Sequence, residues 1–205
     1  MPLRLESTGE FAISDHHNSV SPGLAALVAR AERAAKGAAP VERWNPDFCG
    51  DSEMVIRANG SWTYQNSPIG RPALVRLFSS VLRKDADGQT FLVTPVEKLS
   101  IAVEDAPFIA VEMSRDEGAA GPVLSFRTNV GDLVAAGPKN PLRFAIDAAG
   151  GFTPYLLVRG RLEAKLTRAL AFDLVDFVEG LDDGSSVVRS GGASFALPAG
   201  VGEGA

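Results

Sequence analysis

The sequence predicts an α+β fold: a small N-terminal part made of a helix, a β-hairpin and a second helix, then a larger antiparallel β part closed by a helix. Apolar residues recur at helical spacing in 22–36, 72–82 and 167–178, and they alternate with a period of two through most of 90–166. A polar run at 83–88 separates the two patterns and is the expected linker. The expected organisation is a flexible tail over 1–21, an N-terminal domain over 22–88, a C-terminal domain over 89–198 and a disordered tail over 199–205.

Composition and charge narrow the class of protein. Of 205 residues, 45% are hydrophobic and 22% are charged, which is typical of a globular chain. The net charge of −5 argues against a duplex nucleic-acid partner, because such binders favour a basic excess. No apolar run is long enough to span a membrane, and residues 1–18 lack the pattern of a secretory signal, so we expect a cytoplasmic protein without a transmembrane segment. The lone cysteine and the adjacent His16 and His17 lead us to expect no metal site and no cofactor.

The N-terminal part is expected to begin with a helix over 22–36. Leu24 and Leu27 recur at helical spacing, Ser21 is placed to cap the helix, and Gly37 is placed to end it. A hairpin follows, in which Asn59-Gly60 indicates a type I′ turn.

A second helix completes this part of the chain. After a loop over 67–71, Pro72 opens the helix, and its apolar stripe runs to Leu82. The polar run at 83–88 ends it.

The C-terminal part is expected to be a strand meander. Alternation predicts strands over 91–94, 99–103, 109–113, 123–127, 142–146 and 155–166, then a helix over 167–178 and a last strand within 187–197. Segments 94–99 and 128–133 are similar, as are 71–78 and 158–168. These pairs suggest repeated ββα-like units, and chance similarity between amphipathic segments is the competing explanation.

The most unusual stretch of the chain holds both tryptophans, the single cysteine and three prolines, which suggests a shaped surface. It contains the motifs Trp44-Asn-Pro-Asp-Phe-Cys-Gly-Asp51, Gly60-Ser-Trp62-Thr-Tyr64 and Ser67-Pro-Ile-Gly-Arg-Pro-Ala-Leu74. Further motifs follow in order: Thr94-Pro-Val-Glu-Lys98, Asp105-Ala-Pro-Phe108, Thr128-Asn-Val-Gly-Asp132 and Pro154-Tyr-Leu-Leu-Val-Arg-Gly160. From about residue 41 to residue 197, the chain resembles the bacterial domain-of-unknown-function family 1285 (DUF1285).

The resemblance implies a two-part architecture with repeated motifs, and a C-terminal part similar to pleckstrin-homology-like folds. It implies no established activity. It also implies a ligand site between the two parts, for a nucleotide-like molecule with a signalling role. Arg189 stands where the family pattern has a tryptophan, so a stacking contact at that position is not expected here. A shared fold does not by itself transfer a function.

Cationic side chains gather near the last predicted strand. Alternation places Arg159, Arg161, Glu163 and Lys165 on one face, and Arg168 follows at the start of the helix. Four cations against one carboxylate could grip a phosphate or a carboxylate. A solvated face of an antiparallel sheet is the alternative, and it is somewhat favoured.

Two further positions have competing interpretations. Arg71 precedes the helix that starts at Pro72, where an anion could approach free N–H groups. Pairing of Arg71 with Asp51 or Glu97 in a tight connection is equally expected. Cys49 is expected to be a small buried residue rather than a nucleophile, because the only histidines lie in the tail.

Aromatic and polar residues could complete a site. Trp62 and Tyr64 could stack on a flat ligand, although core packing of the tryptophans is favoured. Glu97 and Asn129 lie beside strand ends, where they could line a pocket between the two parts or cap turns.

The leading hypothesis is a non-catalytic module that binds a small anionic, nucleotide-like ligand at the junction of the two parts. Arg71, Arg159 and Arg168 would supply charge, Trp62 or Tyr64 a stacking plane, and Glu97 and Asn129 hydrogen bonds. The alternatives are a protein-interaction adaptor, which could self-associate, and then a hydrolase-type enzyme. No catalytic residue is expected, because no nucleophile–base pair is visible.

Overall fold

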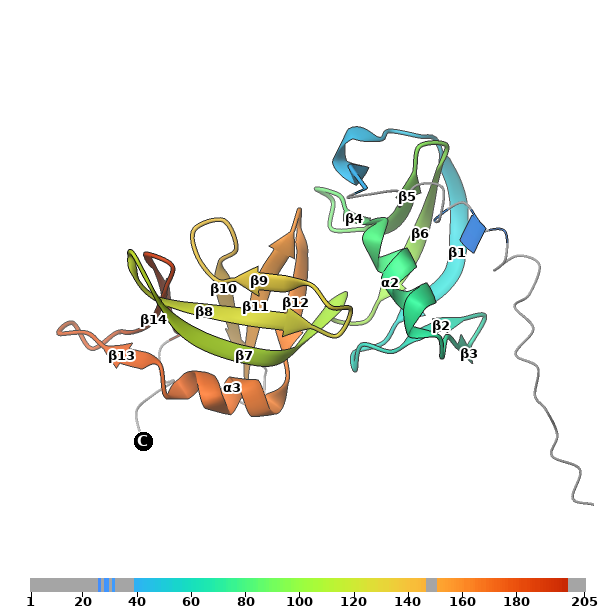
Figure 1. Cartoon of the computed structure of the whole chain (residues 1–205). Coiled ribbons are helices and arrows are strands. Elements are labelled where there is room, and N and C mark those ends of the chain that lie inside the picture. Colours follow the sequence, from blue (N-terminus) through green and yellow to red (C-terminus); the bar gives the residue numbers. More distant parts are fainter. Residues whose placement is uncertain (1–25, 27, 30, 32–38, 147–150, 199–205) are drawn as a thin grey trace, which may run out of the picture.

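A computed structural model describes residues 26, 28–29, 31, 39–146 and 151–198. Within these ranges the chain forms two six-stranded sheets that lie side by side, and one three-stranded sheet (Figure 1). The architecture is mostly β, which agrees with the expected α+β class in its coarse form. Both expected tails, and most of the helix expected over 22–36, lie outside the described residues.

The first sheet has the strand order β3-β2-β1-β6-β5-β4. Its outer pairs are antiparallel, whereas the two central strands, β1 and β6, run parallel. Parallel neighbours need a long connection, so the chain leaves the centre through β1, β2 and β3 and returns from the far edge through β4, β5 and β6. The strands are β1 Phe48–Ile56, β2 Trp62–Tyr64, β3 Ser67–Pro68, β4 Leu82–Lys84, β5 Thr90–Thr94 and β6 Glu97–Val103. Helix α2, Pro72–Ser80, joins β3 to β4, and a 3-10 turn at Val41–Arg43 precedes β1.

The second sheet repeats this path. Its order is β10-β11-β12-β7-β8-β9, and again the first and last strands, β7 and β12, are central and parallel. The expectation of an antiparallel C-terminal sheet was therefore wrong for its central pair, because alternation within a strand does not specify the direction of its neighbour. The strands are β7 Phe108–Gly118, β8 Gly121–Thr128, β9 Leu133–Ala135, β10 Leu142–Ile146, β11 Phe152–Arg159 and β12 Leu162–Leu166.

The segments with similar sequences do not occupy equivalent places in the two sheets. Residues 94–99 connect the fifth strand to the sixth in the first sheet, whereas residues 128–133 connect the second to the third in the second sheet. What the two sheets share is therefore the order in which the chain passes through their six strands.

The two sheets meet at residues 104–107, not at 83–88 as expected. Strands β5 and β6 belong to the first sheet, and residues 85–89 form a turn in which Gly88 N donates to Asp85 O at 3.1 Å. A hairpin turn and a linker share the same polar, glycine-containing composition, which explains the misplaced boundary.

The expected type I′ turn also lies elsewhere. Of Asn59 and Gly60, only Gly60 has a positive φ, at 81°. Gln65 and Asn66, with φ of 47° and 62°, form a two-residue connection between paired β2 and β3, which is the type I′ pattern.

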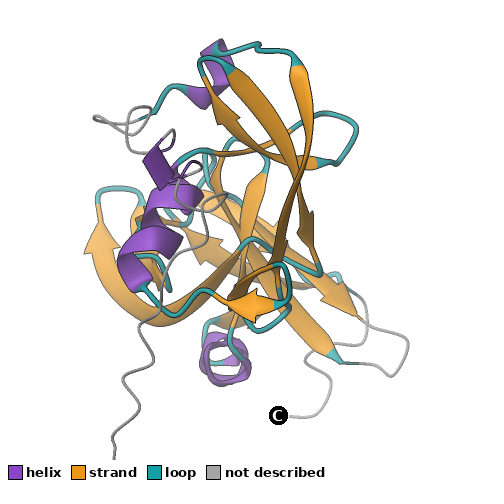
Figure 2. Ribbon diagram, turned by 90° about the vertical axis from the view of Figure 1, so that its right-hand side faces the viewer, coloured by secondary structure: helices purple, strands orange, loops and turns teal. Residues whose placement is uncertain are grey.

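Helix α3, Arg168–Val175, packs against β7, β11 and β12, and Figure 2 shows it end-on beneath the second sheet. The helix ends before the expected residue 178, because Val178 begins the small sheet, whose strands are β13 Val178–Gly180, β14 Ser186–Ser190 and β15 Ala193–Ala196. The segment expected as one strand over 155–166 is the hairpin of β11 and β12, broken at Gly160, where φ is 53°. No helix in the described part of the chain is long and apolar enough to cross a bilayer.

Candidate functional site

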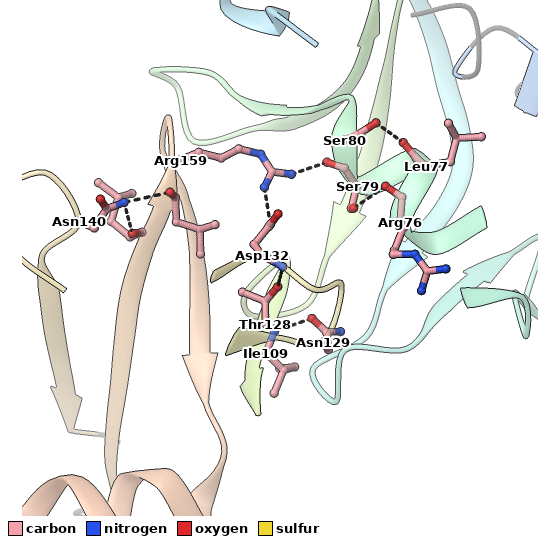
Figure 3. Close-up of polar contacts among 12 residues, drawn as sticks. Arg76, Leu77, Ser79, Ser80, Ile109, Thr128, Asn129, Asp132, Asn140 and Arg159 are labelled. Atoms are coloured by element: carbon pink, nitrogen blue, oxygen red, sulfur yellow. Dashed lines mark hydrogen bonds and ion pairs between the residues drawn. The ribbon is translucent and has the colours of Figure 1, made fainter. Parts of the chain in front are cut away.

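Arg159, at the end of β11, connects the second sheet to helix α2 of the first part by direct contacts (Figure 3). Its Nη1 lies 2.6 Å from Asp132 Oδ2, and its Nη2 donates to Ser79 O, near the end of α2, at 2.7 Å. The guanidinium also lies 4.8 Å from the centre of the Phe108 ring. Arg159 therefore binds α2 to the second sheet and is already engaged at the place where a ligand was expected.

Asn129 makes the second contact across the junction. Its Oδ1 accepts from Ile109 N at 3.0 Å, and its Nδ2 donates to Gly60 O at 3.4 Å. A Cβ on Gly60 would lie 2.6 Å from Ile109 Cγ1, so only glycine permits this approach of the β1–β2 loop to β7. The amide of Asn129 is used in holding the two parts together.

Trp62 cannot offer the stacking plane suggested for it. The side chain is 1% exposed, and its ring stacks on Phe78 at 6.5 Å between centroids. Tyr64 is half-buried on the same strand. The alternative interpretation, core packing, is correct for Trp62.

The other predicted residues are spread over the fold. Arg71 is exposed and occupies the N-cap position of α2, and Glu97 is half-buried at the start of β6. Cys49, expected to be buried, is exposed on β1, and its Sγ lies 3.3 Å from Asp47 O. It is exposed because the first residues of β1 lie outside the core. No group of three metal-binding side chains occurs within the described ranges.

The predicted cationic face is neutralised only in part: Arg159 and Lys165 are paired with Asp132 and Asp105. Glu163 and Lys165 are both half-buried on β12, but a register shift between Leu157 and Arg159 breaks the alternation. Glu163 accepts two hydrogen bonds from Arg143, at 2.9 and 2.8 Å. Arg161 lies exposed in the β11–β12 turn, without an ion pair to any residue that the structure describes.

A pocket of about 460 Å³ lies between the start of β11, the end of β12 and helix α3. We call it the α3 pocket. Its walls are mostly apolar, with three polar side chains and no carboxylate among the described lining residues. The lining comprises Gly151, Phe152, Thr153, Pro154, Lys165, Leu166, Arg168, Ala171, Phe172 and Val175.

Two cations belong to the α3 pocket. Arg168 is exposed, its guanidinium lies 5.5 Å from the ring centre of Phe172, and it forms no ion pair within the described part of the chain. Lys165 is partly buried, and its Nζ lies 2.6 Å from Asp105 Oδ2. Sequence reasoning had singled out both cations but missed the pocket, because Phe152 and Phe172 look like ordinary strand and helix residues.

A polar row crosses the second sheet beside the pocket. Arg143, Tyr155 and Lys165 are cross-strand neighbours, and the Tyr155 hydroxyl donates to Asp105 at 2.9 Å. Burial, reinforced by the hydrogen bond to Asp105, raises the pKa of Tyr155 to about 12. The phenol is therefore protonated at neutral pH and serves as a donor rather than as a base.

Comparison with known proteins identifies the family. Residues 39–106 match "Domain of unknown function (DUF1285), N-terminal domain", and residues 107–197 match "Protein of unknown function (DUF1285), C-terminal domain". The chain belongs to the DUF1285 family. In this DUF1285 protein, the boundary between the two matches falls within the 104–107 linker that joins the two sheets.

The DUF1285 chain is also similar to solved structures. A DUF1285 family protein from Silicibacter pomeroyi DSS-3 is 46% identical, with 83% of this chain and 93% of that chain covered and a TM-score of 0.77. A DUF1285 family protein from Shewanella baltica OS155 is 31% identical, with 60% and 90% covered and a TM-score of 0.49. No curated protein matches the chain.

Proposed function

We propose that this protein binds a small ligand with an anionic head and an apolar body, and that the ligand occupies the α3 pocket. The observation that carries the proposal is the position of Lys165 and Arg168 on a pocket whose other walls are mostly apolar. Small-molecule sites usually have this form, with a few polar groups that orient a ligand held by apolar contacts.

The side chains favour a particular kind of ligand. The planar guanidinium of Arg168 matches a carboxylate or a phosphate, and it has no competing carboxylate within the described ranges. Phe152 and Phe172 offer apolar surface for an alkyl or aromatic body. The volume of about 460 Å³ falls within the usual range of such sites.

A nucleotide fits this lining less well than an acid with an apolar body. The sugar and base of a nucleotide carry several polar groups, and burying them without partners is costly. Apart from the two cations, Thr153 supplies the one polar side chain among the described lining residues. The junction is a weaker candidate, because Arg159 and Asn129 are engaged there in holding the two sheets together.

Calorimetric titration with three probes tests the proposal. Decanoate carries the expected head and body, decan-1-ol lacks the charge, and adenosine monophosphate represents the nucleotide-like class. We expect decanoate to bind most tightly. Native mass spectrometry of gently purified protein, run in parallel, will show any retained ligand and any oligomer.

Three variants locate the binding. Arg168→Ala is expected to weaken decanoate binding about tenfold, because one charge-assisted contact is lost. Ala171→Phe is expected to block binding by filling the pocket. Arg161→Ala is the matched control, since it removes the same charge from an exposed turn outside the pocket lining.

Failure of the wild-type chain to bind any of the three probes would reject the proposal, as would unchanged decanoate affinity in both pocket variants. Preferential binding of adenosine monophosphate would restore the nucleotide-like class. A stable oligomer without any ligand would favour the adaptor hypothesis instead.

A further inference from the structure

Lys165 contacts both the α3 pocket and the linker between the two sheets. It lines the α3 pocket, and its Nζ lies 2.6 Å from Asp105 Oδ2. Asp105 is part of the 104–107 linker that joins the two sheets. An anion that enters the pocket therefore meets a cation already engaged with the linker.

Two adjacent carboxylates at the start of the linker, Glu104 and Asp105, anchor it to the two parts of the molecule. Glu104 accepts hydrogen bonds from Arg57 Nη1 and Ala58 N, both at 2.8 Å, and so is fixed to the first part. Asp105 accepts from Tyr155 and Lys165 and so is fixed to the second sheet. Each carboxylate thus fastens the linker to a different part of the molecule.

We propose that an anionic head group bound in the α3 pocket competes with Asp105 for Lys165 and breaks their ion pair. The linker would then be held less firmly against the second sheet. Occupancy of the pocket would then control how firmly the two sheets are joined. This inference deepens the proposed function and rests on it.

The energies permit such an exchange. The side chains of Lys165 and Asp105 are 31% and 23% exposed, so the pair is partly screened and can be separated at modest cost. Asp105 keeps the hydrogen bond from Tyr155 after Lys165 leaves, so its carboxylate is not left without a donor. Two anions that share one ammonium also repel each other, which makes the competition mutual.

The first test is the affinity for decanoate. Asp105→Asn removes the competing carboxylate, and we expect about threefold to tenfold tighter binding. Glu163→Gln is the matched control. It removes the same charge from the same strand as Lys165, but its partner is Arg143, which does not line the pocket, so a change below about twofold is expected.

A double-mutant cycle assigns the effect to Lys165. In a Lys165→Met background, Asp105→Asn is expected to change the affinity for decanoate by less than about twofold, because the group for which the two anions compete is absent and only their screened repulsion remains. Hydrogen exchange of the linker amides gives a second readout. Decanoate should speed exchange of the Glu104, Asp105 and Ala106 amides in the wild-type chain, whereas in Lys165→Met these amides should exchange fast without decanoate and show no further change.

The outcomes separate this inference from the proposed function. If the wild-type chain does not bind decanoate, both are overturned. If decanoate binds and Arg168→Ala weakens it, but Asp105→Asn matches the wild type in affinity, only the inference is overturned. Linker amides that exchange at the same rate with and without bound decanoate would overturn it as well.

Discussion

Replacing Arg159 with alanine is expected to lower the free energy of unfolding by about 2 kcal/mol. The side chain links three elements: the turn that holds Asp132, the end of α2 at Ser79, and the start of β7 at Phe108. Alanine removes all three contacts, and the Ser79 carbonyl loses its charged donor.

The magnitude follows from the exposure of each contact. The ion pair has side chains 35% and 38% exposed, so after solvent screening it contributes about 0.5 kcal/mol. The hydrogen bond from a charged donor to Ser79 O contributes about 1 to 1.5 kcal/mol. The contact with the Phe108 ring adds about 0.5 kcal/mol, the low end for a partly solvated pair.

Urea titration followed by circular dichroism measures the change. Arg161→Ala, two residues away and without an ion pair in the described ranges, should change stability by less than about 0.5 kcal/mol. Arg159→Lys should recover part of the loss, because one ammonium keeps the charge but not the two-armed geometry. If Arg159→Ala and Arg161→Ala have the same urea midpoint, Arg159 does not hold the junction and the reasoning is refuted.

Three further predictions concern buried or paired polar groups. Ser190 is 1% exposed, and its hydroxyl accepts from Leu124 N and donates to Ala136 O, both at 2.8 Å. Ser190→Ala should lower the free energy of unfolding by about 2 kcal/mol, measured by thermal or urea unfolding. Ser194→Ala, at an exposed position, should lower it little. Tyrosinate absorbance should show Tyr155 titrating near pH 12, and Asp105→Asn should move that pKa toward the ordinary value of 10.0, with Tyr155→Phe identifying the transition. Because this pKa is raised on folding, its stabilising contribution is complete below pH 10 and is lost as the pH rises through about 12. Burial acts to raise the pKa of Asp85, but hydrogen bonds and charge from Arg83 and Lys98 outweigh burial and lower the pKa below 3.8. The stabilisation from this carboxylate is therefore present above pH 3.8 and is lost on further acidification. Asp85→Asn should flatten this part of a pH–stability curve.

Local patterns predicted many of the elements, because alternation and capping signals act within one segment. The strand expected at 142–146 is β10, and Pro72 opens α2 as expected. Strand partners were not predictable in the same way. The pairing of β1 with β6 depends on the path of the whole first part, and nothing in either strand specifies a parallel neighbour.

Of the candidate site, only the two cationic side chains were predictable from the sequence. Lys165 and Arg168 stood out as cations in an acidic protein, but the apolar walls around them gave no distinct signal. Arg159 and Asn129 were predicted to supply charge and a hydrogen bond to a ligand. Their partners are within the chain, since contacts between two packed parts use the same donors and acceptors as a ligand site.

The strand order common to both sheets affects how the chain folds during synthesis. In each six-stranded sheet the strand synthesised first must wait for the strand synthesised last, since those two lie together at the centre. On the ribosome, the first sheet can close only after residue 103 has emerged, and the second only after residue 166. Both steps join residues far apart in sequence, so slow closure of each sheet is expected. A nascent chain halted before β6 or β12 would leave one edge of β1 or β7 without a partner strand, because β2 and β8 pair only with the other edge.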